Sequence, residues 1–135
     1  MKLLIGGAAL VKLGSDRRTE DTDYLVCEEG LPMFFFDREN NVDYVNAAAN
    51  KFFAEIYKME SGNDTGIASP AALLELKAYS LVQHCLNFNW AKADAAEYDM
   101  KFLVRNFGLS MPTIVKKYVT AGEWSEIEKV MKSVR

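Results

Sequence analysis

The first half of the chain alternates short apolar runs with polar turns. Such runs, bounded by glycine, asparagine or charged residues, predict β-strands. The expected strands cover residues 2–5, 22–27, 33–37 and 42–45. We expect the third strand, with the sequence MFFFD, to be largely buried. Between them, residues 8–13 predict a short helix closed by Gly14, residues 15–21 a loop, and residues 47–59 a helix or a strand.

The second half has helical periodicity instead. Ser69 is a good N-cap and Pro70 suits the first turn of a helix, whereas Gly108 is suited to ending one. The expected helices cover residues 71–86, 92–106 and, in one or two pieces, 111–135. The pattern therefore predicts an α+β fold, a small mixed sheet followed by a helical half. We expect a single domain over residues 1–135, with a sheet-bearing core at 1–68 and a helical segment at 69–135.

The composition agrees with this expectation. With 135 residues, 50% of them hydrophobic and 12% aromatic, the chain can form a packed core. Its apolar start, MKLLIGGAALVKLG, is too short and too interrupted for a membrane span and lacks a cleavage site, so we expect a soluble, cytoplasmic protein. Cys27 and Cys85 lack metal-ligand spacing, which favours reduced thiols with the role of small core residues.

The charge is unevenly distributed. The net charge is −3, but residues 1–100 hold 9 basic against 16 acidic residues, −7 in all, and residues 101–135 hold 7 against 3, which gives +4. The basic tail could help to hold a polyanion, but a solvated helix face is the favoured interpretation. The residues concerned are Lys116, Lys117, Lys129, Lys132 and Arg135. The density of positive charge is far below that of a dedicated nucleic-acid binder.

Three carboxylates suggest a metal site. Asp21 and Asp23 are two residues apart, so on a strand they project to the same side. Mg²⁺ takes carboxylate oxygens together with substrate phosphates. Asp43 is a third acid on an otherwise apolar strand, and if that strand neighbours the first two acids, the three together could hold the ions of a two-metal site. An Asp beside a turn is the structural alternative for Asp43.

Several other polar residues also have two interpretations. A helical wheel places Lys77 on the apolar face of its helix, where it could contact a triphosphate or extend its amine to solvent. Arg17 and Arg18 precede the acids and could reach a phosphate or pair with Asp16, Glu20 or Asp21. His84 has no partner at a spacing that suggests a catalytic triad. Asp94, Glu97 and Asp99 are expected to form an exposed helix face.

The residues LIGGAALVKLGSDRRTEDTDYLV resemble the opening of nucleotidyltransferases related to DNA polymerase beta. In one branch of that superfamily, which includes toxin, antitoxin and abortive-infection proteins, a strand ends in Gly-Gly-Ala and an Arg-x-Thr-x-Asp-x-Asp pattern follows. Residues 4–8 match the first part, and Arg17, Thr19, Asp21 and Asp23 match the second. The resemblance places the phosphate loop at Gly6-Gly7 rather than at Gly14-Ser15.

Two later segments extend the resemblance. The family's third carboxylate maps onto Asp43, and its Ser-Pro-x-x-Leu-Leu-x-Leu-Lys helix matches residues 69–77. The match covers roughly residues 3–104. One position departs from the family pattern, because Ala96 stands where an acid is common. The accessory part of the site therefore lacks this acid.

The resemblance implies an enzyme that transfers a nucleoside monophosphate from an NTP to a hydroxyl acceptor, with two Mg²⁺ ions and release of pyrophosphate. Asp21 and Asp23 would bind both ions and Asp43 would complete the acceptor side. Gly6, Gly7, Arg17, Thr19 and Lys77 would bind the nucleotide. The acceptor could be a tRNA end, a protein or a small molecule, and a homodimer is compatible with this function. The alternative is a non-catalytic module of the same fold, such as an antitoxin or phage-type regulator that binds a partner protein.

Overall fold

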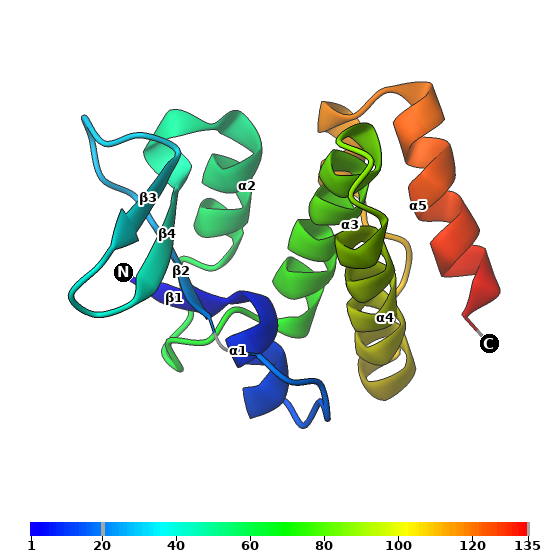
Figure 1. Cartoon of the computed structure of the whole chain (residues 1–135), viewed down its shortest axis with the longest axis horizontal. Coiled ribbons are helices and arrows are strands. Elements are labelled where there is room, and N and C mark those ends of the chain that lie inside the picture. The colour runs from blue at the N-terminus through cyan, green and yellow to red at the C-terminus, as the bar shows by residue number, and fades with distance from the viewer. Residues whose placement is uncertain (20, 135) are drawn as a thin grey trace. The chain divides into compact units, whose positions relative to one another are not determined.

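Strands occupy the first half of the chain and helices the second, which confirms the predicted α+β class (Figure 1). The computed structural model describes residues 1–19 and 21–134, so the part of the predicted loop at Glu20 and the end of the basic tail at Arg135 lie outside it. The chain forms two compact units, Met1–Ser69 and Pro70–Arg135. Among the described residues, no helix has both the length and the apolar character needed to cross a membrane.

The first unit contains a four-stranded mixed sheet. Its strands are β1 (Leu3–Ile5), β2 (Thr22–Val26), β3 (Phe34–Asp37) and β4 (Val42–Asn46). They lie in the order β1-β2-β4-β3, and only the central pair, β2 and β4, is parallel. The helix α1 (Gly6–Lys12) begins directly after β1. Residues 47–59, for which helix and strand were both open, form a 3-10 turn η1 (Ala47–Ala49) and the helix α2 (Lys51–Met59).

The two faces of this sheet carry different side chains. Leu3 and Leu25 are fully buried register partners on one face, which β2 also presents to α2. On the other face, the register partners Tyr24, Tyr44 and Phe35 form a row of stacked rings across β2, β4 and β3. The ring centroids are 6.2 Å apart for Tyr24 and Tyr44, and 4.9 Å for Tyr44 and Phe35. Strand alternation therefore separates an aliphatic core from an aromatic row.

The prediction that the third strand is largely buried is wrong. β3 is an edge strand, and the Phe34 and Phe36 side chains are 58% and 50% exposed. The expected core role of the cysteines fails for the same physical reason, since Cys27 is exposed just past the end of β2 and Cys85 is only half-buried. An apolar residue type does not determine burial when the residue lies at the margin of an element.

Helices form the whole second unit. They are α3 (Pro70–Leu86), α4 (Trp90–Phe107), the 3-10 turn η2 (Val115–Tyr118) and α5 (Ala121–Ser133). Gly108 ends α4 in the left-handed conformation, as expected. Thr120 begins α5 with a capping box, in which its hydroxyl and the Glu123 carboxylate each accept a backbone N–H from the other residue.

Two buried polar side chains hold irregular segments in place. The Glu75 carboxylate on α3 accepts backbone N–H groups from Thr113, Ile114 and Val115 at 2.7–2.9 Å and so fixes the start of η2. Asn46 ends β4, where its side chain accepts from Glu28 N and donates to the carbonyls of Glu28 and Leu31. Local sequence patterns predict neither of these roles. Because both side chains are buried, the loss of these hydrogen bonds would leave polar groups unsatisfied and destabilise the fold.

Candidate functional site

Two of the three predicted acids are neighbours on the sheet. Asp23 on β2 pairs in register with Asp43 on β4, and the two strands are parallel. Register partners on adjacent strands have backbones about 4.8 Å apart and project their side chains to the same face. Both side chains are half-buried. β4 is thus the neighbour of β2, which is the arrangement that a shared acidic site requires.

Asp21 lies just before this pair. β2 begins at Thr22, and the Asp21 side chain is exposed, while its backbone carbonyl accepts a bond from Thr19 Oγ1 at 3.2 Å. Across residues 1–19 and 21–134, no group of three or more His, Cys, Asp or Glu side chains is arranged to hold a metal ion. The donor chemistry of the acids nevertheless fits Mg²⁺, because this ion is bound by one or two carboxylates and completes its shell with water and phosphate. The magnesium site stays a prediction.

The Asp23 carboxylate lies against the backbone of Gly6. Asp23 pairs with Ile5 on β1, the residue directly before the glycine. A Cβ atom built on Gly6 would be only 2.6 Å from Asp23 Oδ2. Gly6 also has φ +66°, a conformation that costs little only for glycine. Both steric space and backbone conformation therefore require glycine at the junction of β1 and α1.

The second glycine of the pair is enclosed by the following loop. A Cβ atom on Gly7 would lie 2.8 Å from Thr19 Oγ1 and 3.2 Å from Arg17 Cζ. The loop is ordered locally, since Ser15 Oγ accepts a bond from the Arg17 N–H at 3.2 Å. A Cβ on Gly14, in contrast, would meet nothing within 4 Å. The structure thus gathers Arg17 and Thr19 at the first glycine pair and not at the Gly14-Ser15 alternative.

The two arginines of this loop differ in burial. Arg17 is half-buried and Arg18 is exposed. Arg17 Nε lies 3.5 Å from the carbonyl oxygen of Arg18. Glu20, which is one of the carboxylates that could pair with these arginines, lies outside the described residues. The half-buried Arg17 is therefore the arginine that belongs to the gathered group.

Lys77 has a carboxylate partner within the helical unit. Its Nζ lies 3.0 Å from Asp99 Oδ2, which joins α3 to α4. The Asp99 side chain is 1% exposed, whereas that of Lys77 is 16% exposed. The predicted inward position of Lys77 therefore has a counterion in the structure. A triphosphate contact for Lys77 stays a prediction.

The expectation that Asp99 lies on an exposed helix face is wrong. Asp94 is exposed and Glu97 half-buried, but Asp99 belongs to the buried side of α4. The sequence carries a signal for this, because Asp99 is three residues after the buried Ala96 and four before the buried Leu103. A helical wheel of α4 therefore predicts that Asp99 faces inward, together with Ala96 and Leu103.

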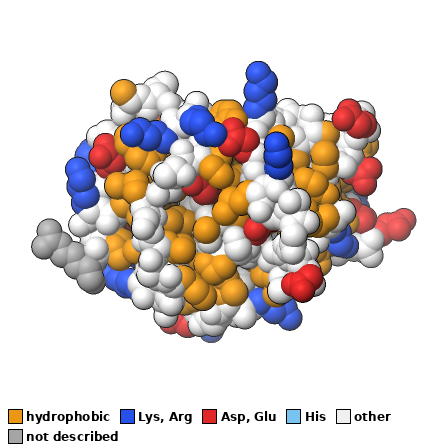
Figure 2. All heavy atoms as spheres, turned by 180° about the vertical axis from the view of Figure 1, so that it is seen from behind, with side chains coloured by type: hydrophobic (Ala, Val, Ile, Leu, Met, Phe, Trp, Pro, Cys, Tyr) orange, Lys and Arg blue, Asp and Glu red, His pale blue; other side chains and the backbone are white. Residues whose placement is uncertain are grey.

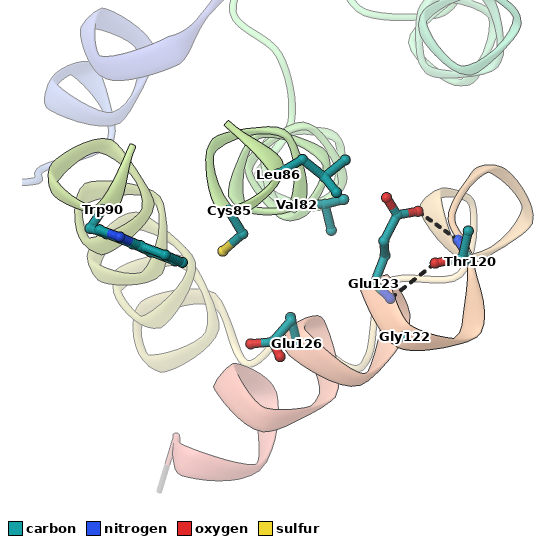
Figure 3. A pocket seen from close by; sticks show the side chains of 8 residues that line it. All are labelled: Val82, Cys85, Leu86, Trp90, Thr120, Gly122, Glu123 and Glu126. Carbon is teal, nitrogen blue, oxygen red and sulfur yellow. Dashed lines mark hydrogen bonds between the residues drawn. The ribbon is translucent and has the colours of Figure 1, made fainter. Parts of the chain in front are cut away.

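A pocket of about 410 Å³ lies among the helices of the second unit, and its lining includes none of the residues predicted for the site. In Figure 3, Trp90 and Cys85 face its interior from α4 and α3, with Glu126 of α5 below them. Burial, and after it the negative charge of Glu126, raises the pKa of the Cys85 thiol above its ordinary value of 9.0. The thiol is therefore protonated at neutral pH, which makes it a poor nucleophile and a poor metal ligand.

Basic side chains are interspersed with other side chains on the face drawn in Figure 2. On the face seen in Figure 2, Lys and Arg side chains alternate with acidic and hydrophobic ones and form no continuous patch. On α5, Lys129 pairs with Glu126 and Lys132 with Glu128, all at exposed positions or partly exposed ones. These pairs agree with the solvated helix face favoured for the basic tail.

Comparison with models of protein families, with curated proteins and with solved structures gives no significant match for this chain.

Proposed function

We propose that the chain transfers a nucleoside monophosphate from an NTP to a hydroxyl acceptor, with release of pyrophosphate and dependence on Mg²⁺. The observation that carries the proposal is the position of the Asp23 carboxylate. It lies against the glycine that opens α1 and beside its register partner Asp43. A strand carboxylate at a glycine turn brings metal-binding oxygens next to backbone that a phosphate can approach.

Each residue of the gathered group has a role in the proposal. Asp21, Asp23 and Asp43 would hold Mg²⁺, which when bound neutralises phosphate charge and favours deprotonation of the acceptor hydroxyl. Gly6 and Gly7 allow Asp23, Thr19 and Arg17 to approach the backbone closely, because neither glycine carries a side chain.

Two neighbours of the glycine pair supply hydrogen-bond donors. Arg17 offers a planar guanidinium and Thr19 a hydroxyl, and both lie where a Cβ of Gly7 would be. They would orient phosphate oxygens. Lys77 enters the proposal as a further triphosphate contact, in which its ammonium would turn from Asp99 to the nucleotide or bind both.

The test measures Mg²⁺–NTP binding and nucleotide transfer separately. Each of the four labelled NTPs is incubated with Mg²⁺ and candidate tRNA, protein or small-molecule acceptors, and NTP affinity is measured by calorimetry. We expect Asp23→Asn and Asp43→Asn to reduce transfer by at least about 100-fold, because they remove charge that orients the metal and phosphate. Asp64→Asn is the matched control, since it changes an exposed Asp of the same unit.

Wild-type protein that binds no Mg²⁺–NTP and labels no acceptor would exclude the enzyme. The fold would then serve as a non-catalytic module. Transfer that survives Asp23→Asn at the wild-type rate would show that the chemistry takes place elsewhere.

A further inference from the structure

The two edges of the sheet differ in how they are covered. At β1, Leu4 N donates to the carbonyl of Gly66 at 2.8 Å, and Ala68 N donates to the carbonyl of Leu4 at 3.0 Å, so residues 66–68 close this edge. The opposite edge is β3 (Figure 1). Among the described residues, no backbone hydrogen bond reaches Phe34 or Phe36 from outside the β3–β4 ladder. β3 is therefore an open edge.

The hydrogen-bond pattern shows which groups of β3 point outward. Asn46 N donates to the carbonyl of Met33 at 2.8 Å, so this pair exchanges ladder bonds. Bonded pairs alternate along an antiparallel ladder, and Phe35 is therefore bonded to β4 whereas Phe34 and Phe36 direct their N–H and C=O groups to the free edge. The half-exposed rings of these two residues lie on one face. An open, apolar strand edge is a template for strand addition.

We propose that β3 pairs antiparallel with β3 of a second copy of this chain, about a two-fold axis at Phe35. Phe34 of each copy then lies opposite Phe36 of the other. The two outward N–H groups and two outward carbonyls of each copy are all used, which gives four hydrogen bonds between the copies. The two sheets become one continuous eight-stranded sheet.

The sequence of β3 fits a copy of itself in this register. Phe34 and Phe36 of both copies form one cluster of four rings, and Phe35 meets Phe35, which joins the two aromatic rows. Asp37 lies opposite Met33 and not opposite another carboxylate. A register centred on Phe34 instead would place Pro32, which has no N–H, opposite Phe36. The register centred on Phe35 is therefore the one in which the outward N–H and C=O groups of β3 all form hydrogen bonds.

The area involved sets the strength of the association. A phenylalanine side chain has on the order of 200 Å² of surface, so the exposed fractions of Phe34 and Phe36 amount to roughly 400 Å² over two copies. Stable interfaces bury at least about 1,200 Å². The dimer is therefore weak, with a dissociation constant on the order of 100 μM.

The test combines sedimentation velocity between about 10 μM and about 1 mM with hydrogen exchange at both limits. We expect wild-type protein to shift from monomer to dimer. The amides of Phe34 and Phe36 should exchange about fourfold more slowly at the high concentration, while that of Phe35 is protected at both. The Phe34→Lys/Phe36→Lys variant should remain monomeric. Phe88→Lys, which changes a 77% exposed phenylalanine of the helical unit, should dimerise as wild type does.

Phe34→Pro provides a second variant, because it removes an outward N–H and leaves the β3–β4 bonds intact. It should weaken association at least about tenfold. A wild-type monomer at about 1 mM would overturn the proposal. So would a dimer whose Phe34 and Phe36 amides exchange equally at both concentrations, or a folded double-lysine variant that dimerises with unchanged affinity.

Discussion

The Lys77–Asp99 pair gives the sharpest prediction about the helical unit. Replacing Lys77 by Met keeps most of the side-chain volume but leaves the Asp99 carboxylate, which is 1% exposed, without the ammonium 3.0 Å away. Removing one partner of a buried ion pair costs about 3–5 kcal/mol. We expect Lys77→Met to lower the free energy of unfolding by this amount.

The reciprocal change should cost less. Asp99→Asn leaves Lys77, whose side chain is already 16% exposed and can extend its ammonium to water. We expect a loss of about 1–3 kcal/mol. The double variant should be more stable than the sum of the single changes predicts, by about 1–3 kcal/mol, because the two residues interact directly.

Urea unfolding followed by circular dichroism measures all three variants. Lys101→Met is the matched control, because Lys101 pairs with Glu97 at 3.9 Å on a more exposed part of α4. Additive single changes, or a loss under about 1 kcal/mol for Lys77→Met, would refute the argument. A triphosphate contact of Lys77 would have a second consequence. The folded Lys77→Met variant should then bind NTP at least about tenfold more weakly than wild type.

Three further predictions concern the helical unit and the thiols. Glu75→Gln should lower the free energy of unfolding by about 1–3 kcal/mol in urea, because an amide cannot accept all the N–H groups of residues 113–115; an unchanged value would contradict this. Burial, with Lys92 and Lys77 adding to it, lowers the pKa of His84 below 6.5. The neutral form is therefore favoured in the fold, so this contribution to stability is complete above about pH 6.5 and is lost as the pH falls through the lowered pKa. His84→Gln should flatten the dependence of the urea midpoint on pH in that range, and parallel curves would disprove it. Cys85, with its raised pKa, should react with iodoacetamide at about pH 8 at least about tenfold more slowly than the exposed Cys27, and peptide mapping showing equal rates would be inconsistent with the burial.

Local sequence patterns were sufficient for most elements. Each of the four expected strands overlaps an observed one, and Gly108 and Pro70 mark helix boundaries as predicted. These features depend on neighbouring residues only, which is why periodicity, capping and turn chemistry detect them. The sequence does not distinguish helix from strand at residues 47–59, because their apolar residues follow no single period until Asn50 begins α2.

Features that depend on distant residues were predicted less well. The run MFFFD predicts a strand, but its exposure depends on whether another strand lies beyond it, and β3 has none on that side among the described residues. The partner of Lys77 is a comparable case. The pattern of α3 alone shows that Lys77 faces inward. The Asp99 that compensates its charge lies on α4, so the pattern of that helix is needed as well. Edges and ion pairs are properties of tertiary structure.

Gly6 and Gly7 connect a local sequence pattern with the residues of the proposed site. Two glycine-containing turns precede the acids in the sequence, and the resemblance to nucleotidyltransferases implies that the first is the phosphate loop. Packing distinguishes the two turns, because side chains of the later loop and of β2 occupy the volume that Cβ atoms on Gly6 and Gly7 would need, while Gly14 has free space. At a glycine that is required only for its backbone conformation, an added β-carbon is strained but meets no neighbouring side chain. Gly6 lies against Asp23, and Gly7 lies against Thr19 and Arg17, so the absence of two side chains makes room for the polar residues to which the proposed function assigns metal and phosphate.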